Sequence, residues 1–301
     1  MERTTISHED ACIHEFSPDL EAADTVEDGA SLTFETIDSL DGEIQTEDQV
    51  LESVPDDVNP ASGPVAVEGA TPGDVLEVEI EEVRVNEDRG RVVTTPGFGL
   101  LQDHDDIEHP HTRITDVEGD SITFGDLEID IQPVVGTIGV APEDDTYSTL
   151  VPHDHGGNLD TTDVTTGTTA YFPVFQDGAM LAMGDSKAAM ADGEMCGTGA
   201  EIGTDVDVTV RVIDDPEVTL QRPLVETADS WKTIASAETM ADAVERANRD
   251  LVRLLEREHD LDPTDAYLLS SLVGGLEISQ VVDPLVTARN AIPKQYLTNP
   301  F

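Results

Sequence analysis

The clearest periodic stretch of this 301-residue chain is DVDVTVRVI, residues 205–213. Valine occupies every second position, and Asp, Thr or Arg fills the positions between the valines. Because successive side chains of a strand point to opposite faces, this alternation predicts a β-strand with one buried and one solvated face. We therefore expect a fold built on half-buried strands.

A second alternating segment, residues 75–85, repeats this pattern with one irregularity. Its apolar residues share one face up to residue 80, and the alternation then slips by one position at Glu81 and Glu82. A slip of one residue is typical of a β-bulge or a strand break. The segment is therefore expected to bend or break near Glu81.

Shorter strands and turns account for most of the remaining chain. Residues 122–124 and 127–131 flank the pair Gly125-Asp126, a spacing typical of a β-hairpin. Residues 133–203 are expected to be long, irregular, glycine-rich connections. The predicted fold is mainly β, barrel-like or sandwich-like, with a helical or α/β region at the C-terminus.

We divide the chain into an N-terminal β-rich region, a central β region with the site loops, and a C-terminal region, at residues 1–132, 133–230 and 231–301. In the C-terminal region, apolar residues recur at helical spacing from 237 to 259, with Ser236 as the expected N-cap. A second helix is expected after the N-cap Asp262, with a proline at its first position and Gly274 near its end.

The charge of the chain is its most unusual property. Sixty-five Asp and Glu residues face fifteen Lys and Arg residues, which gives a formal net charge of -50. Such a surface excludes general electrostatic binding to nucleic-acid phosphates or to anionic membranes. The acids are spread among regular apolar residues, so we interpret the chain as a folded protein adapted to molar salt, where the screening length is about 3 Å. The alternative is a polyanion that collects cations or a basic partner.

No targeting segment is evident in the sequence. The N-terminal residues lack the apolar run of a signal peptide, and no uncharged run reaches the roughly 20 residues of a membrane helix. We therefore expect a cytoplasmic location. The two cysteines, Cys12 and Cys196, could form one disulfide, although nothing in the sequence demands a disulfide framework.

The segment VPHDHGGNLD, residues 151–160, contains a candidate metal-binding site. Two histidines that are two residues apart point the same way on a strand, a spacing that metal sites use. The adjacent glycines would let the backbone approach a ligand closely. A polar loop with a satisfied turn is the alternative. The candidate residues are His153, His155, Gly156, Gly157, Asn158 and Asp160.

A second candidate segment is GDSKAAMADGEMCGTGAE, residues 184–201. Its carboxylates stand among glycines and methionines, which favours partial burial, and a buried carboxylate needs a cation or a hydrogen-bond partner. Lys187, one of three lysines in the chain, lies within the segment, so a structural salt bridge is the plain alternative. A nucleophile elbow at residues 184–188 and a Cys-Glu-Lys site at Cys196 match too weakly to adopt.

Five segments, spread over most of the chain, stand in an order that is typical of one family. They are NPASGPVAVEGATPGDVLEVEI (59–80), PVVGTIGVAP (133–142), VPHDHGGNLD (151–160), GDSKAAMADGEMCGTGAE (184–201) and DAYLLSSLVGGLEISQVVD (265–283). In this order they resemble the acetamidase/formamidase family. The resemblance implies a hydrolase of small linear amides that releases a carboxylate and ammonia. It also implies a homo-oligomer, most simply a dimer.

The resemblance further implies a divalent metal ion, zinc or calcium, that activates water. Its expected ligands are Asp160, Asp185 and either His153 or His155. The family usually has histidine where this chain has Lys187, and glycine where it has Ala191. Two interpretations follow: the site binds metal more weakly, or the lysine takes the place of the cation. A family member that binds an amide or a metal without turnover is the alternative function.

The remaining roles are also carried over from the resemblance. Glu194 is the candidate general acid/base, and Asn158 is expected to contact the substrate carbonyl. The backbone amides of Gly156 and Gly157 are expected to bind substrate, and Lys187 is expected to act electrostatically. Asp38, in the segment FETIDSLDGEI of residues 34–44, is expected to complete the site.

Overall fold

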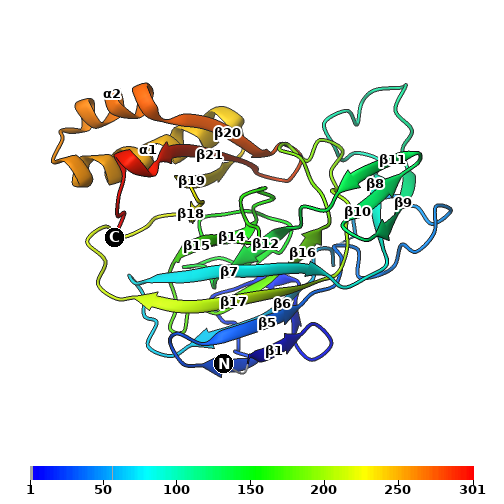
Figure 1. Cartoon of the computed structure of the whole chain (residues 1–301), viewed down its shortest axis with the longest axis horizontal. Coiled ribbons are helices and arrows are strands. Elements are labelled where there is room, and N and C mark those ends of the chain that lie inside the picture. The colour runs from blue at the N-terminus through cyan, green and yellow to red at the C-terminus, as the bar shows by residue number, and fades with distance from the viewer. Residues whose placement is uncertain (1–2, 56) are drawn as a thin grey trace.

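The computed structural model describes residues 3–55 and 57–301. Residues 1, 2 and 56 of the predicted N-terminal region lie outside the described residues. Strands dominate the structure, and the two longest helices lie together at one corner, near the C-terminus (Figure 1). Two large sheets pack face to face, so the predicted mainly β, sandwich-like architecture with a helical C-terminal region is confirmed.

The larger sheet has nine strands drawn from the whole length of the chain. Its order is β1-β5-β17-β7-β15-β18-β19-β21-β20, and all three predicted regions contribute to it. The division into regions stays a prediction. The strands are β1 (Thr4–Ser7), β5 (Ser31–Glu35), β17 (Thr204–Ile213), β7 (Val75–Val85), β15 (Thr168–Pro173), β18 (Leu224–Glu226), β19 (Ser230–Ala237), β21 (Val286–Pro293) and β20 (Gly275–Gln280).

The second large sheet has the order β14-β12-β16-β6-β2, with β4 paired to β6. Its strands are β14 (Gly156–Asn158), β12 (Val134–Gly139), β16 (Leu181–Lys187), β6 (Ala61–Val67), β2 (Cys12–Ile13) and β4 (Asp24–Val26). Two smaller groups, β11-β10-β9-β8 and β13-β3, complete the β structure. They are β11 (Leu127–Asp130), β10 (Ser121–Phe124), β9 (His111–Glu118), β8 (Arg89–Thr94), β13 (Tyr147–Ser148) and β3 (Glu15–Phe16).

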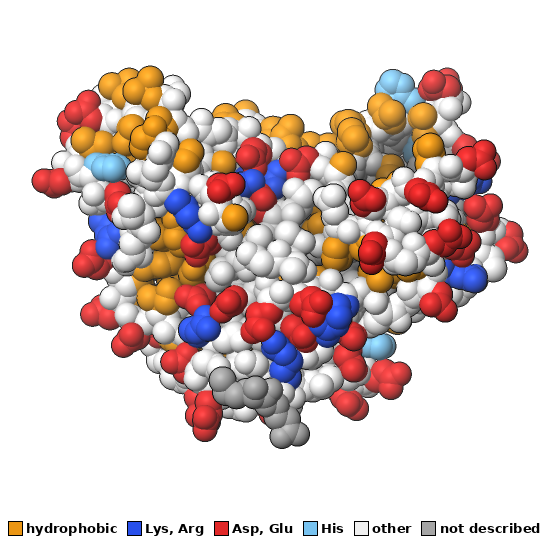
Figure 2. All heavy atoms as spheres, viewed as in Figure 1, with side chains coloured by type: hydrophobic (Ala, Val, Ile, Leu, Met, Phe, Trp, Pro, Cys, Tyr) orange, Lys and Arg blue, Asp and Glu red, His pale blue; other side chains and the backbone are white. Residues whose placement is uncertain are grey.

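On the face shown in Figure 2, Asp and Glu side chains are more numerous than Lys and Arg side chains. Asp and Glu side chains are distributed across this face and are not gathered into one patch. Hydrophobic side chains collect at the corner where the two helices lie. The spread of the acids on this face matches their spread along the sequence.

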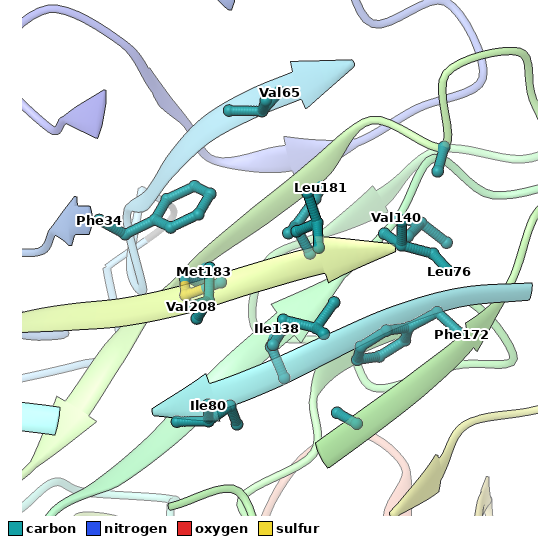
Figure 3. Close-up of a cluster of buried hydrophobic side chains, with 14 of the residues drawn as sticks. Phe34, Val65, Leu76, Ile80, Ile138, Val140, Phe172, Leu181, Met183 and Val208 are labelled. Atoms are coloured by element: carbon teal, nitrogen blue, oxygen red, sulfur yellow. The ribbon is translucent and has the colours of Figure 1, made fainter. Parts of the chain in front are cut away.

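The main hydrophobic core lies between the two large sheets (Figure 3). Phe34, Ile80 and Val208 reach it from the nine-stranded sheet, and Ile138 and Leu181 reach it from the second sheet. All five side chains are fully or almost fully buried. Burying one such side chain contributes about 1.5–3 kcal/mol, so this shared interface holds the two sheets together.

The two alternating segments form neighbouring antiparallel strands, β17 and β7, as their patterns predict. Asp207 pairs with Glu82 but Val208 pairs with Ile80, so Glu81 is left over. This register shift is the bulge that the sequence predicts at Glu81. The predicted hairpin is also confirmed, because β10 and β11 pair across Gly125-Asp126.

The helices begin where their capping side chains stand. Helix α1 (Met240–His259) starts after Thr239, whose side chain accepts the N–H of Asp242. The prediction of Ser236 as the N-cap of this helix is wrong. Ser236 belongs to β19, and its hydroxyl oxygen lies 2.9 Å from that of Thr287. Helix α2 (Pro263–Val273) has the predicted N-cap, Asp262, and a short 3-10 helix η1 (Lys294–Tyr296) follows β21.

The central region contains more regular structure than its sequence predicts. Residues 133–203 were expected to be irregular connections, but they contain β12, β13, β14, β15 and β16. Strands β12 and β16 are buried on both faces, so they lack the polar alternation by which a half-buried strand is recognised. Cys12 and Cys196 are both free. Within residues 3–55 and 57–301, no helix is long and apolar enough to cross a membrane.

Candidate active site

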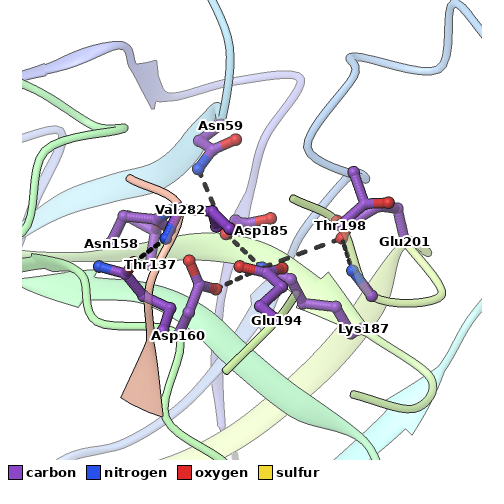
Figure 4. A network of polar contacts seen from close by, with 12 residues as sticks. Asn59, Thr137, Asn158, Asp160, Asp185, Lys187, Glu194, Thr198, Glu201 and Val282 are labelled. Atoms are coloured by element: carbon purple, nitrogen blue, oxygen red, sulfur yellow. Dashed lines mark hydrogen bonds and ion pairs between the residues drawn. The ribbon is translucent and has the colours of Figure 1, made fainter. Parts of the chain in front are cut away.

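Charged side chains surround Lys187, the last residue of β16, in the interior of the molecule (Figure 4). Its Nζ lies 2.5 Å from Asp160 Oδ1 and 2.6 Å from Asp185 Oδ2. Glu194 Oε1 and Glu201 Oε1 follow at 3.4 and 4.0 Å. The Lys187 side chain is only 2% exposed. Four carboxylates therefore converge on one buried ammonium.

These side chains come from separate parts of the chain. Asp185 and Lys187 lie on β16, Asp160 follows β14, and Glu194 and Glu201 lie in the segment between β16 and β17. Asp160, Asp185 and Glu194 all have positive φ, a conformation that is rare for residues other than glycine. Such backbone strain clusters at functional sites, where the surrounding structure holds it in place.

Burial is the main influence on the pKa values of the charged groups in this cluster. Burial raises the pKa of Asp185 and Glu194 well above their ordinary values, and neighbouring carboxylates add to the effect. Burial alone would lower the pKa of Lys187, but the carboxylates, led by Asp160, hold it well above its ordinary value. The lysine therefore stays charged, and Asp185 and Glu194 hold a proton more readily than ordinary carboxyl groups do.

Asn158 is held in one orientation beside the cluster. Its Oδ1 accepts a hydrogen bond from Thr137 at 2.6 Å, and its Nδ2 donates to Asp283 at 2.9 Å. Asp283 is buried in the loop between β20 and β21, and burial together with Asp160 and Glu194 raises its pKa well above the ordinary value. Within residues 3–55 and 57–301, the second N–H of the Asn158 amide has no acceptor, so it can donate to a ligand.

A cavity of about 40 Å³ lies against the charged cluster. One side of it is polar, with Asn158, Lys187 and Glu194, and the other side is apolar. The apolar side comes mainly from the long connection between β5 and β6, together with β8. Its side chains are Leu40, Leu51, Val54, Val58, Val93, Phe98 and Leu150. The site therefore has a charged end and an apolar wall within one small volume.

The structure does not bring the predicted histidine ligands to this cluster. His153 and His155 line a different cavity, of about 590 Å³, which the Lys187 cluster does not line. The His153 ring stacks on Tyr147 at 4.3 Å, and the His155 ring packs against Phe16 at 4.9 Å. Burial lowers the pKa of His155 to about 3, so it is a neutral core ring. Their spacing on the chain is right for a metal site, but the aromatic packing holds both rings elsewhere.

Gly156 and Gly157, which were predicted to bind substrate, do not line this cavity. The Gly156 amide already donates to the carbonyl of His153. A Cβ on Gly156 would overlap the Ile138 carbonyl oxygen, and one on Gly157 would overlap that of Val151. Both glycines therefore serve close backbone packing.

Asp38 is buried and lies next in sequence to Ser39 and Leu40, which line the cavity. Its carboxylate lies 2.9 Å from the guanidinium of Arg91 and accepts the backbone N–H groups of Leu40 and Gly42 at 2.8 and 3.0 Å. Burial raises the pKa of Asp38 to about 6, although Arg91 opposes the shift. Asp38 therefore holds the loop that carries Leu40 and does not itself line the cavity.

Three acidic or amide residues of the site, Glu201, Asp283 and Asn59, were not predicted as site residues. Asp283 bonds Asn158, and Asn59 donates its Nδ2 to Asp185 Oδ2 at 3.2 Å. Both stand at the ends of segments that resemble the family, 265–283 and 59–80, and this position was the only signal in the sequence. The residue type of Asp283 does not mark it, because Asp is abundant in the chain.

The residues around Asp185 do not fit the divalent metal ion that the resemblance implied. An ion bound by the same oxygens of Asp160 and Asp185 would lie beside Lys187 Nζ. A divalent ion and an ammonium about 4 Å apart repel by roughly 8 kcal/mol at an effective dielectric of about 20. Among the described residues, no group of three or more His, Cys, Asp or Glu side chains is arranged to hold a metal.

Comparison with known proteins agrees with this architecture. Residues 1–149 and 143–297 match the Acetamidase/Formamidase family. An acetamidase from Bacillus halodurans has a TM-score of 0.93 and 37% identity, with 98% of each chain covered. A predicted acetamidase/formamidase from Thermoanaerobacter tengcongensis has a TM-score of 0.93 and 38% identity, with 98% of this chain and 97% of that chain covered.

A more distant relative is the acetamidase of Mycolicibacterium smegmatis, which is 28% identical over 65% of this chain. The match covers 64% of that relative, so the chain spans less than two thirds of its length. The two solved structures, by contrast, are covered almost completely. The family match over nearly all of the sequence agrees with the fold and with the order of the five segments. This chain therefore belongs to the acetamidase/formamidase family.

Proposed function

We propose that the protein hydrolyses small linear amides, such as formamide and acetamide, to a carboxylate and ammonia. The observation that carries the proposal is the small cavity with one apolar wall and one end formed by Lys187, Asn158 and Glu194. Family membership and similarity to proteins named acetamidase support the reaction class. A cytoplasmic location is part of the same proposal.

The size of the cavity supports a very small substrate. One water molecule needs roughly 10–15 Å³ of such volume, so a cavity of about 40 Å³ holds about three waters. Formamide has three non-hydrogen atoms and acetamide has four. The apolar wall suits the hydrogen or methyl group of these amides, and the charged end suits the amide group itself.

The residues of the site have the chemical properties that amide hydrolysis needs. In the proposed reaction, water attacks the carbonyl carbon, and Glu194 takes a proton from the water. The free N–H of Asn158 and the positive charge of Lys187 stabilise the oxyanion. Glu194 then gives the proton to the nitrogen as the C–N bond breaks, which yields the carboxylic acid and ammonia. The acid then passes its proton to ammonia, which leaves carboxylate and ammonium.

A buried acceptor is present for the N–H groups of the substrate. Glu201 Oε2 has no hydrogen-bond partner among the described residues, although Glu201 lines the cavity. An unpaired buried acceptor is costly, and an amide N–H₂ group would satisfy it. This orientation would direct the nitrogen of the amide toward the carboxylates.

The test is ammonia release from formamide, acetamide and benzamide in molar potassium chloride. We expect turnover of the first two and little turnover of benzamide, whose ring is too large for the cavity. Absence of turnover for all small amides by the folded protein would contradict the proposal. Calorimetric binding of acetamide without turnover would instead identify a family member that has lost catalysis.

We also propose that the protein works in molar salt as a homo-oligomer. The net charge of -50 supports the first part. Exposed apolar side chains on α2 and on the edge strand β20 support the second, with Leu268, Leu272 and Leu276 between 55% and 80% exposed. Sedimentation velocity in high salt tests this, and a monomer at micromolar concentration would contradict it.

A further inference from the structure

We propose that the ammonium of Lys187 is the resident cation of this active site and takes the place of a divalent metal ion. The inference deepens the proposed amide hydrolysis and rests on it for its catalytic meaning. The position of the cation itself is argued from contacts, space and charge around Lys187, which do not depend on any activity.

The first argument is that the oxygens that could bind a metal are already directed at the lysine. Asp160 Oδ1 and Asp185 Oδ2 accept two of the three ammonium N–H groups, at 2.5 and 2.6 Å. Glu194 Oε1 lies 3.4 Å from Nζ, and its carboxylate is drawn beside the same centre in Figure 4. A metal ion could enter this centre only by displacing Nζ.

The second argument is that the backbone leaves room for a lysine at this position. A Cβ on Gly136 would overlap Nζ and both paired carboxylate oxygens, and a Cβ on Gly199 would lie 2.5 Å from Lys187 Cγ. Neither glycine has a positive φ, so backbone conformation does not require glycine at either position. The close approach of the Lys187 side chain is what requires it.

The third argument concerns charge. Asp160, Asp185, Glu194 and Glu201 converge on a buried point, and carboxylates in such a place need a cation. Lys187 is covalently attached, so the cation is always present and does not depend on a metal supply. The expected consequence is an active site that does not respond to chelators.

The experiment measures metal content and needs no turnover. Wild type, Lys187→His and Lys187→Arg are incubated with Zn²⁺ or Mn²⁺ in molar potassium chloride, passed through a desalting column and analysed by mass spectrometry. We expect wild type and Lys187→Arg to stay well below one equivalent per chain. We expect Lys187→His to gain a metal, with a dissociation constant at least about tenfold lower in calorimetry.

Lys232→His is the matched control, because Lys232 also bridges two carboxylates, Asp163 and Glu277, each at 2.8 Å. It should gain no comparable metal affinity. An equal gain in this control would show that any histidine in this acidic chain collects metal, and would overturn the inference. If Lys187→His does not fold, anomalous diffraction from wild-type crystals soaked in Mn²⁺ shows whether an ion binds beside Asp185. An ion bound by Asp185 would overturn the proposal, and its absence there would support it.

Measurements of turnover test the role of Lys187 and the proposed amidase function separately. Wild type treated with a chelator should hydrolyse acetamide at an unchanged rate. Loss of turnover that added metal restores would overturn the inference and keep the amidase function. A metal-free wild type that hydrolyses no small amide would instead contradict the function, while the metal measurements would still support Lys187 as the cation.

Discussion

Glu194 combines burial, backbone strain and proximity to the cation in a single residue. It is 5% exposed, has a positive φ, and its carboxylate lies 3.4 Å from Lys187 Nζ. Because the amide of glutamine cannot carry the proton, Glu194→Gln should lower kcat about 10²–10⁴-fold and leave the melting temperature nearly unchanged. Glu245→Gln, at a 73% exposed side chain, is the control. Near-normal turnover by Glu194→Gln would remove this residue from its proposed role.

Gly136 sets the space in which the ion pairs form. An alanine there would overlap Lys187 Nζ and its two carboxylate partners, so Gly136→Ala should cost about 1–3 kcal/mol of stability and remove most activity. Gly275→Ala is the matched control, because a Cβ on Gly275 meets nothing within 4 Å. Thermal melts and amide turnover of the two variants check this, and equal behaviour of both would contradict it.

His155 gives a pH dependence whose sign is fixed by its burial. Its pKa falls from 6.5 in an exposed histidine to about 3, so between these values the unfolded chain binds more protons than the folded one. The stability that the neutral ring contributes is therefore complete above about pH 6.5 and is lost as the pH falls through this window. Carboxyl groups with raised pKa values, such as Asp38, oppose this trend.

The variant His155→Phe isolates this contribution, because it keeps an aromatic ring and removes the titrating group. Its unfolding free energy should fall less steeply than that of wild type between about pH 6.5 and 5, by up to about 1.4 kcal/mol per pH unit. Urea unfolding in molar potassium chloride measures the difference. Parallel curves for the two proteins would show that His155 does not titrate in this way.

At the scale of elements, the loop between β20 and β21 ties the C-terminal region to the active site. Gln280 Oε1 accepts the N–H groups of Val282 and Asp283, and its Nε2 donates to the Leu285 carbonyl and the Thr287 hydroxyl. The amide of Gly193, next to Glu194, donates to the Ser279 carbonyl. One buried side chain therefore fixes the loop that carries Asp283 to Asn158.

Gln280→Ala should lower both stability and turnover, since it leaves buried backbone groups unpaired at about 1–3 kcal/mol each. Thr239→Ala is the comparison, because it removes the N-cap of α1 at a cost of about 1 kcal/mol and Thr239 does not line the cavity. Thermal melts with steady-state kinetics test the pair. Unchanged kcat and KM in Gln280→Ala would mean that the loop has no part in positioning Asp283.

At the scale of the whole molecule, the net charge of -50 controls the conditions under which the chain folds. Dialysis from molar potassium chloride to about 0.1 M lengthens the screening distance from about 3 Å to about 10 Å. Repulsion among the surface carboxylates then acts on the compact state and should lower the melting temperature sharply. An unchanged melting curve over this range would contradict the salt adaptation.

The sequence by itself determined the features that depend on local periodicity and composition. The alternation of valines predicted β17, a slip in the same pattern predicted the bulge at Glu81, and Asp262 predicted the start of α2. These features are readable because each depends on neighbouring residues in the chain. The order of five segments also identified the family, and the family implied the reaction class.

Only the tertiary structure decided which charged side chains meet. Strands β12 and β16 are buried on both faces, so their sequences give no alternation, although β16 carries Asp185 and Lys187 of the site. Lys187 and Asp160 are 27 residues apart in sequence, yet they form a buried ion pair, whereas His153 and His155 lie in a different cavity. The physical reason is that sheet pairing and core packing, which act between distant residues, set the positions of these side chains.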